Sequence, residues 1–510
     1  MTTVGSSSRD KVSSQAPLSA QLGVSSIIFM VLAAAAPLSV VAGLGPVGIA
    51  TGNGIGFPST FILIALILLI FSIGFTAMTP YVRESGGFYS YIQAGLGFPA
   101  GVGATFMAVY AYVAMQVGMY PFAGLLISNF LGVFGLSVPW WVISGVLIAT
   151  IGYLGYRNID FSAKVLAVLL IAELVVVTIV SVAIVGQGGE EGLTLKPFTF
   201  DAVFSGNFAL GLTFAVSSFM GFESTAVYRD EAKDPAKTIP RATYGAVLIV
   251  TVVYTLATWA FVEGWGSRAV STALESMSAG NMYQMTAARY VGDWLALVIN
   301  VLLVTSLLAC ILSWHNVTAR YLFTNGRSGA LPQFLGRQHM KHRSPGVASL
   351  ATSLVIALLT LVVLITGLDP YGQVYSWFSA VGVIGVVFMM FVVSISTLMF
   401  FAKNKVLHDK IGIIVRLIAP LTSVVVLAVL VGLIIVNFPV LVGEVDAQGS
   451  PSPGPVTAVI FGVAVISVLI GCGWGWWLYA FRRNTLTVTQ VDTNEVDEVT
   501  VSENHAGSVV

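Results

Sequence analysis

The chain has 510 residues, of which 56% are hydrophobic and only 9% are charged, and its formal net charge is zero. A soluble globular protein carries roughly 25% charged residues, so this composition excludes a protein whose whole surface faces water. The balanced charge gives no reason to expect a nucleic acid as a partner. We therefore expect an all-α integral membrane protein whose surface is covered largely by the lipid bilayer.

Long apolar runs with few charges follow one another along the chain. About 20 apolar residues cross a bilayer as a helix, and only helices and closed barrels satisfy the backbone inside lipid. The second run is the clearest, because no charged residue occurs between Phe57 and Met78. We predict twelve transmembrane helices, at residues 22–50, 57–79, 98–128, 137–156, 160–186, 205–228, 240–263, 290–321, 346–367, 371–401, 411–437 and 456–481.

Lysine and arginine are distributed unequally between the predicted loops. If the N-terminus is inside and the spans alternate, 20 of the 23 basic residues fall inside, and only Lys196, Arg268 and Arg289 fall outside. Positive residues concentrate in cytoplasmic loops, so this bias supports an even number of spans. It predicts a multi-pass protein of the plasma membrane with both termini in the cytoplasm.

The predicted organisation has one transporter domain, at 22–481, between two polar tails. We expect a cytoplasmic N-terminal tail at 1–21 and a disordered cytoplasmic tail at 482–510, because neither has an apolar run. The external loop at 264–289 is long enough for short helices. Within the domain, the predicted parts are a first repeat at 22–186, a second repeat at 205–401, and extra helices at 411–437 and 456–481.

The first and sixth predicted spans are both interrupted near the middle. Span 1 contains Ala35-Ala36-Pro37-Leu38-Ser39, and span 6 contains Phe219-Met220-Gly221-Phe222 followed by Glu223. An unwound turn leaves free N–H and C=O groups, which are tolerated at membrane depth only where they line a cavity. Proline and glycine are also common in membrane helices, so either break alone leaves a structural explanation open. The matched pair favours a secondary transporter with its site at mid-membrane, because such breaks recur at equivalent positions of inverted repeats.

Three motifs accompany these spans. They are Gly221 to Ala226 followed by Asp230 to Ala242, then Glu84-Ser85-Gly86-Gly87-Phe88-Tyr89-Ser90-Tyr91, and the segment from Arg320-Tyr321 to Gly329-Ala330-Leu331-Pro332. With these motifs the sequence resembles the amino acid–polyamine–organocation family over residues 22–481. The resemblance implies a LeuT-like fold of five-plus-five inverted repeats with discontinuous helices 1 and 6, followed by two extra helices. It also implies alternating access to a central site between spans 1, 3, 6, 8 and 10.

The breaks and the resemblance together give a set of expected site residues. Glu223 matches a family glutamate implicated in gating or proton coupling, and Lys164 matches a lysine whose ammonium group occupies the sodium position in proton-coupled members. Span 1 departs from the glycine-serine-glycine turn of many members, and Pro37 removes one backbone donor there. The residues expected to bind substrate are Ala35, Ala36, Pro37, Leu38, Ser39, Phe219, Met220, Gly221, Phe222 and Trp314.

Several of these residues also have a structural explanation. Glu223 in its protonated form could join two helices, and Lys164 could extend from the inner end of span 5 to the membrane surface. Glu173 and His315 are interpreted as buried structural residues, and Cys310 and Cys472 as small core residues. Further candidates for the pocket wall, chosen by helix position only, are Tyr112, Met115, Gln116, Tyr375 and Trp377.

The expected function is a permease, a secondary active transporter that moves amino acids or related amines across the plasma membrane with protons. An exchanger or a sodium-coupled carrier of the same fold is the alternative. A membrane-embedded enzyme or a sensor is disfavoured, because the sequence has no H-E-x-x-H motif and no appended signalling domain. We expect no catalytic residue, no cofactor and no metal ligand, and the oligomeric state stays open.

Overall fold

The computed structural model describes residues 22–82, 87–157, 163–226, 228–229, 232–276, 280–339 and 344–482, without the side chains of residues 163–166 and 482. The predicted tail at 1–21, the tail beyond residue 482 and the start of the second motif lie outside the described residues. The α-helices are α1 (Val24–Ala35), α2 (Pro37–Ser39), α3 (Gly45–Thr51), α4 (Phe57–Met78), α5 (Phe88–Leu96), α6 (Phe98–Val133), α7 (Trp140–Arg157), α8 (Ala163–Gly186), α9 (Phe200–Val203), α10 (Phe208–Ser218), α11 (Pro235–Glu263), α12 (Ala269–Ser276), α13 (Met282–Tyr290), α14 (Asp293–Arg327), α15 (Gly346–Thr366), α16 (Ser376–Lys403), α17 (Ala419–Leu441) and α18 (Pro455–Arg482). Shorter 3₁₀ and π turns are η1 (Val40–Leu44), η2 (Gly54–Gly56), η3 (Lys196–Phe198), η4 (Phe222–Ala226), η6 (Gly266–Arg268), η7 (Gln333–Gly336), η8 (Pro370–Tyr375), η9 (Lys405–His408) and η10 (Ile414–Ile418).

Ten segments of the described chain are long and apolar enough to cross a membrane. All twelve predicted spans contain helix, but two are not among these ten. The helix α7 has only 18 residues and ends in Arg157, and span 6 is divided into α10, of 11 residues, and η4, of 5 residues. The chain is therefore a multi-pass membrane protein, and the count of twelve stays a prediction.

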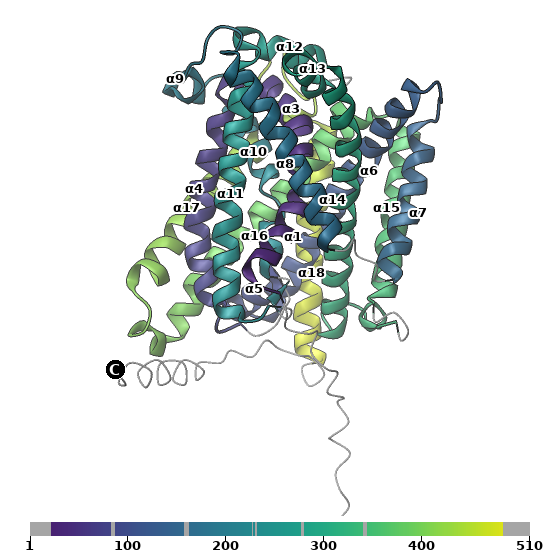
Figure 1. The fold of residues 1–510 in the computed structure, drawn as a ribbon. Helices are drawn as coiled ribbons and strands as arrows, with labels where there is room; N and C mark the ends of the chain where they lie inside the picture. Colours follow the sequence, from purple (N-terminus) through teal and green to yellow (C-terminus); the bar gives the residue numbers. More distant parts are fainter. Residues whose placement is uncertain are drawn as a thin grey trace, which may run out of the picture.

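The long helices form one bundle with inner and outer members (Figure 1). The spans differ in how much of their most apolar 18-residue stretch is buried. In span 1, 78% of these residues are buried, whereas only 28% are buried in the segment that contains α17 and 17% in α18. The outer face of α17 exposes Val425, Val429 and Val436, an apolar stripe that lipid must cover. Spans 1, 3 and 10 are the most buried, at 78%, 67% and 72%, so they form the core in which a site can be enclosed.

Helix α6 lies at the centre of the contacts between spans, because it packs against α7, α14, α16 and α18. At one edge of the bundle α7 lies beside α15 (Figure 1). The outer helices α17 and α18 contact this core from outside, α17 through α16 and α4, and α18 through α6. The inverted repeat and the domain bounds stay predictions.

Short helices cover one end of the bundle, where the external loop was predicted (Figure 1). Helix α12 contacts α3, and α13 contacts η1, so both lie against the second half of span 1. Glu190 pairs with Arg268 and with Arg289, two of the three basic residues predicted to lie outside. The Arg289 guanidinium also lies 5.1 Å from the centre of the Trp265 ring. These contacts connect the segment after α8 to the loop that contains α12 and α13.

Candidate functional site

Span 1 is interrupted at Ala36, between α1 and α2. Ala36 has a φ of 48° and is the only non-glycine residue in the described part of the chain with positive φ. Pro37 follows, and proline cannot continue the preceding helix because it has no N–H group. In a regular helix the Leu38 N–H would donate to the Ala34 carbonyl. Instead, Leu38 donates to Glu173 Oε2 at 3.2 Å, and the Ala34 carbonyl accepts the Cys310 thiol at 3.0 Å.

Span 6 is interrupted at Gly221, which has a φ of 106°. Its N–H donates to Glu223 Oε2 at 2.9 Å, and its carbonyl accepts the Ser224 hydroxyl at 2.6 Å. A Cβ atom at this position would lie 3.1 Å from Ala34 Cβ. Glycine is therefore needed both for the backbone conformation and for the close approach of span 1, and the two breaks touch each other.

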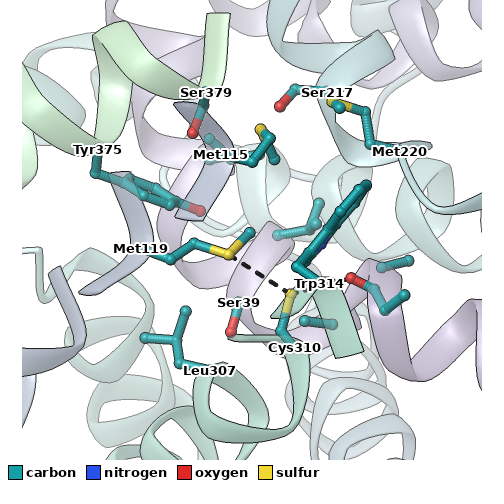
Figure 2. Close-up of a pocket in the computed structure, with 15 residues that line it drawn as sticks. Ser39, Met115, Met119, Ser217, Met220, Leu307, Cys310, Trp314, Tyr375 and Ser379 are labelled. Carbon is teal, nitrogen blue, oxygen red and sulfur yellow. Dashed lines mark hydrogen bonds between the residues drawn. The ribbon is translucent and has the colours of Figure 1, made fainter. Parts of the chain in front are cut away.

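A cavity of about 20 Å³ lies beside the two breaks (Figure 2). Its wall comes from spans 1, 3, 6, 8 and 10, the five spans predicted to surround the site. This volume holds roughly one water molecule, so a substrate needs the wall to move. The lining residues are Ala34, Ala35, Ala36, Ser39, Val40, Leu44, Met115, Met119, Ser217, Met220, Leu307, Cys310, Trp314, Tyr375 and Ser379.

The cavity wall is apolar and soft, with a few polar groups. Figure 2 shows Met115, Met119 and Trp314 directed toward the same space, and methionine side chains adapt readily to a new shape. Among the described residues, no charged side chain lines the cavity. Ser217 and Trp314 are 5% and 2% exposed, and within the described chain neither Ser217 Oγ nor Trp314 Nε1 has a hydrogen-bond partner. These two groups are available to a ligand.

Two buried carboxyl groups lie behind the cavity wall, one at each break. Glu173 and Glu223 are 4% and 3% exposed. Glu223 Oε1 has no hydrogen-bond partner among the described residues. Ser306 lies within hydrogen-bonding reach of the Glu173 carboxyl group and accepts the Ser39 hydroxyl at 3.2 Å, which connects Glu173 to the cavity wall. Among the described side chains, no lysine or arginine forms an ion pair with either glutamate.

The structure brings only part of the predicted substrate-binding set to the cavity. Ala35, Ala36, Ser39, Met220 and Trp314 line it. The other five predicted residues lie close by without lining it, and their binding roles stay predictions. Pro37, Leu38 and Gly221 form the broken backbone, whereas Phe219 and Phe222 line a second, entirely apolar cavity of about 10 Å³.

The remaining candidates are divided between the cavity and the surrounding core. The side chain of Lys164 lies outside the described residues, so its predicted role is untested. Met115 and Tyr375 line the cavity, and the Tyr112 ring packs on Trp314 at 5.3 Å. Gln116, Trp377 and His315 instead form hydrogen bonds elsewhere, with Thr318, Leu441 and Ser349.

Several lining residues fall outside the predicted set, although helical periodicity can find them. Met119 lies four residues after Met115, and Cys310 lies four residues before Trp314. Residues four apart share one helix face, so extending each candidate by one turn would have identified both. Glu173 is a different case, because no local pattern predicts its contact with the break in span 1.

Comparison with known proteins identifies the family. A family model described as "Amino acid permease" matches residues 22–474. The chain belongs to this amino acid permease family. The match confirms the resemblance to this family, and all three motifs lie within the matched range.

Relatives of this permease are named for several different cargoes. The branched-chain amino acid permease BcaP of Bacillus subtilis is 24% identical over 327 residues, which cover 60% of this chain and 67% of that protein. The low-affinity putrescine importer PlaP of Escherichia coli is 23% identical over 349 residues, 65% of this chain and 73% of that protein. The glutamate/serine transporter AimA of Bacillus subtilis is 22% identical over 298 residues, 54% of this chain and 53% of that protein. These names do not agree on one substrate.

Proposed function

We propose that this permease carries a small molecule with an ammonium group, an amino acid or a related amine, across the plasma membrane by alternating access. The observation that carries the proposal is the cavity between two interrupted helices, because it is enclosed by spans 1, 3, 6, 8 and 10. The cargoes named for BcaP, PlaP and AimA differ in their side chains and charge. An ammonium group is the feature common to those cargoes.

A five-plus-five inverted repeat would explain why the two breaks lie together. In such transporters the equivalent broken helices of the two halves face each other across the site, and one bundle of helices rocks against the other. Here Gly221 lies against Ala34, so movement of either broken helix changes the cavity. The small volume of the cavity fits a closed state within such a cycle.

Glu223 is the residue that we propose for proton coupling. Its Oε2 atom accepts the Gly221 N–H, while its buried Oε1 atom has no partner among the described residues. An ionised carboxylate only accepts hydrogen bonds, whereas the protonated form also donates one. Proton binding would therefore change the bonding of the span 6 break. Lys164 is a second proposed proton site, which rests on the family resemblance alone.

Uptake into proteoliposomes tests this function. We expect the purified full chain to take up at least one labelled compound from a panel of amino acids and amines, with a faster rate under an inward proton gradient. Glu223→Gln and Lys164→Ala are expected to remain folded and to lose this dependence on pH. If no compound is taken up, the permease proposal is wrong. If both variants keep the wild-type pH dependence, the proton roles are wrong, and an exchanger or a sodium-coupled carrier replaces them.

A further inference from the structure

Several of the backbone donors that could hold a substrate carboxylate are already engaged inside the protein. A carboxylate at a helix break needs free N–H groups. Pro37 has none, the Leu38 N–H is bonded to Glu173, and the Gly221 N–H is bonded to Glu223. Other amides at the breaks donate to backbone carbonyls: Ala36 to Leu32, Val40 to Ala36, Phe219 to Val216 and Met220 to Ser217. No lysine or arginine in the described part of the chain lines the cavity to replace these donors.

The carboxyl groups behind the cavity wall attract a cation when they are ionised. Glu173 and Glu223 are buried next to the two breaks, and none of the described cationic side chains pairs with them. Among the described residues, Tyr254 and Cys310 are ionisable side chains that interact with Glu173, and neither carries a positive charge. Charges interact strongly in a medium of low dielectric constant. In their ionised forms the two carboxyl groups repel a substrate carboxylate, whereas an ammonium group balances a buried carboxylate.

The rest of the cavity fits an apolar body. Met115, Met119, Met220 and Leu307 supply aliphatic and thioether surface. Trp314 adds an aromatic ring, which attracts a nearby ammonium group through its π face. A carboxylate or a second charged group placed against these apolar side chains would lose its hydration without gaining a partner of opposite charge.

We propose that the substrate is an organic amine with an apolar body and no carboxylate, and that Glu173 balances the charge of its ammonium group. The Glu173–Ser306–Ser39 connection places this carboxyl group directly behind the polar part of the cavity wall. The inference rests on the proposed permease function and narrows its substrate class. Amino acids with the same apolar body are then poor substrates, because only their carboxylate differs.

Matched pairs of compounds test the substrate class. Phenethylamine is phenylalanine without its carboxylate, and isoamylamine is leucine without its carboxylate. We would titrate the purified full chain with each of the four compounds and measure the concentration that gives half-maximal thermal stabilisation. Each amine is expected to act at a concentration at least tenfold below that of its amino acid. Equal or stronger stabilisation by the amino acids, or no stabilisation by either amine, would overturn the inference.

Glu173→Gln tests the role of the carboxylate itself. Glutamine keeps the shape and can still accept the Leu38 N–H, so the variant removes mainly the charge. We expect the half-maximal amine concentration to rise at least tenfold in this variant. Glu263→Gln is the matched control, because Glu263 is 5% exposed but binds Thr194 at the end of α11, away from the cavity wall. If the half-maximal amine concentration were the same in Glu173→Gln as in Glu263→Gln, the proposed role of Glu173 would be wrong. If the uptake panel reveals a transported amino acid but no amine, the permease function stands and only the amine assignment fails.

Discussion

Gly221→Ala is the substitution that most sharply perturbs the contact between the two breaks. Gly221 has a φ of 106°, and the new Cβ would lie 3.1 Å from Ala34 Cβ and 3.7 Å from the Ala35 backbone nitrogen. A side chain held in such a sparsely populated backbone region costs about 1–3 kcal/mol. If this cost falls on the closed state of the cycle, the population of that state decreases about 5- to 150-fold.

The assay is the initial rate of substrate uptake into proteoliposomes that contain equal amounts of folded protein. We expect Gly221→Ala to lower this rate by the same 5- to 150-fold range. Gly432→Ala is the control, because Gly432 lies within α17 and its added Cβ meets no atom within 4 Å. A Gly221→Ala protein that transports as fast as Gly432→Ala would refute the argument that the breaks must approach this closely.

Three further predictions concern single side chains. Trp314→Leu removes the π face beside the ammonium group, so the half-maximal amine concentration should rise about 2- to 30-fold; an unchanged thermal titration would contradict this. Glu190→Gln removes both outer ion pairs, but surface pairs are weak, so an SDS-unfolding titration should show a loss below about 1 kcal/mol. Burial acts to raise the pKa of Glu444, but hydrogen bonds from the backbone N–H groups of Gly454, Val456 and Thr457 hold it below its ordinary value of 4.5. A lowered pKa stabilises the fold above pH 4.5, and this contribution is lost as pH falls through the folded-state pKa. The protection of the Gly454, Val456 and Thr457 amides against exchange, relative to their intrinsic rates, should therefore decrease in acid in the wild type but not in Glu444→Gln.

Much of the fold follows from the sequence because the bilayer imposes strict rules on it. The length of an apolar run predicts a spanning helix almost independently of the rest of the fold. The predicted span at 57–79 and the observed α4 therefore differ by only one residue at one end. The ends of the helices are harder to predict, because water outside the bilayer can satisfy the backbone there and hydrophobicity no longer fixes the last residue. The structure extends α14 to Arg327, six residues beyond the predicted end, and begins α11 at Pro235 rather than at residue 240.

The candidate site was only partly predictable. Pro37 and Gly221 mark the breaks because each has a local backbone property that no neighbour can change. The contact of Glu173 with Leu38 joins residues 135 positions apart, and it exists only because spans 1 and 5 pack together. Sequence patterns within one helix contain no such information, so they predict only a structural role for Glu173. They likewise predict a core position for Cys310, although this residue lies one helical turn from Trp314.

Cys310 offers the most direct test of the claim that the cavity between the breaks is the transport site. The chain has two cysteines, so Cys472→Ala leaves Cys310 as the only thiol, at the cavity wall. The measurement is the rate at which N-ethylmaleimide alkylates Cys310 in proteoliposomes, with and without the compound that shows the highest uptake. We predict that a saturating concentration of this compound slows alkylation at least several-fold, with the same half-maximal concentration as thermal stabilisation. Alkylation at the same rate with and without a transported compound would contradict the central claim.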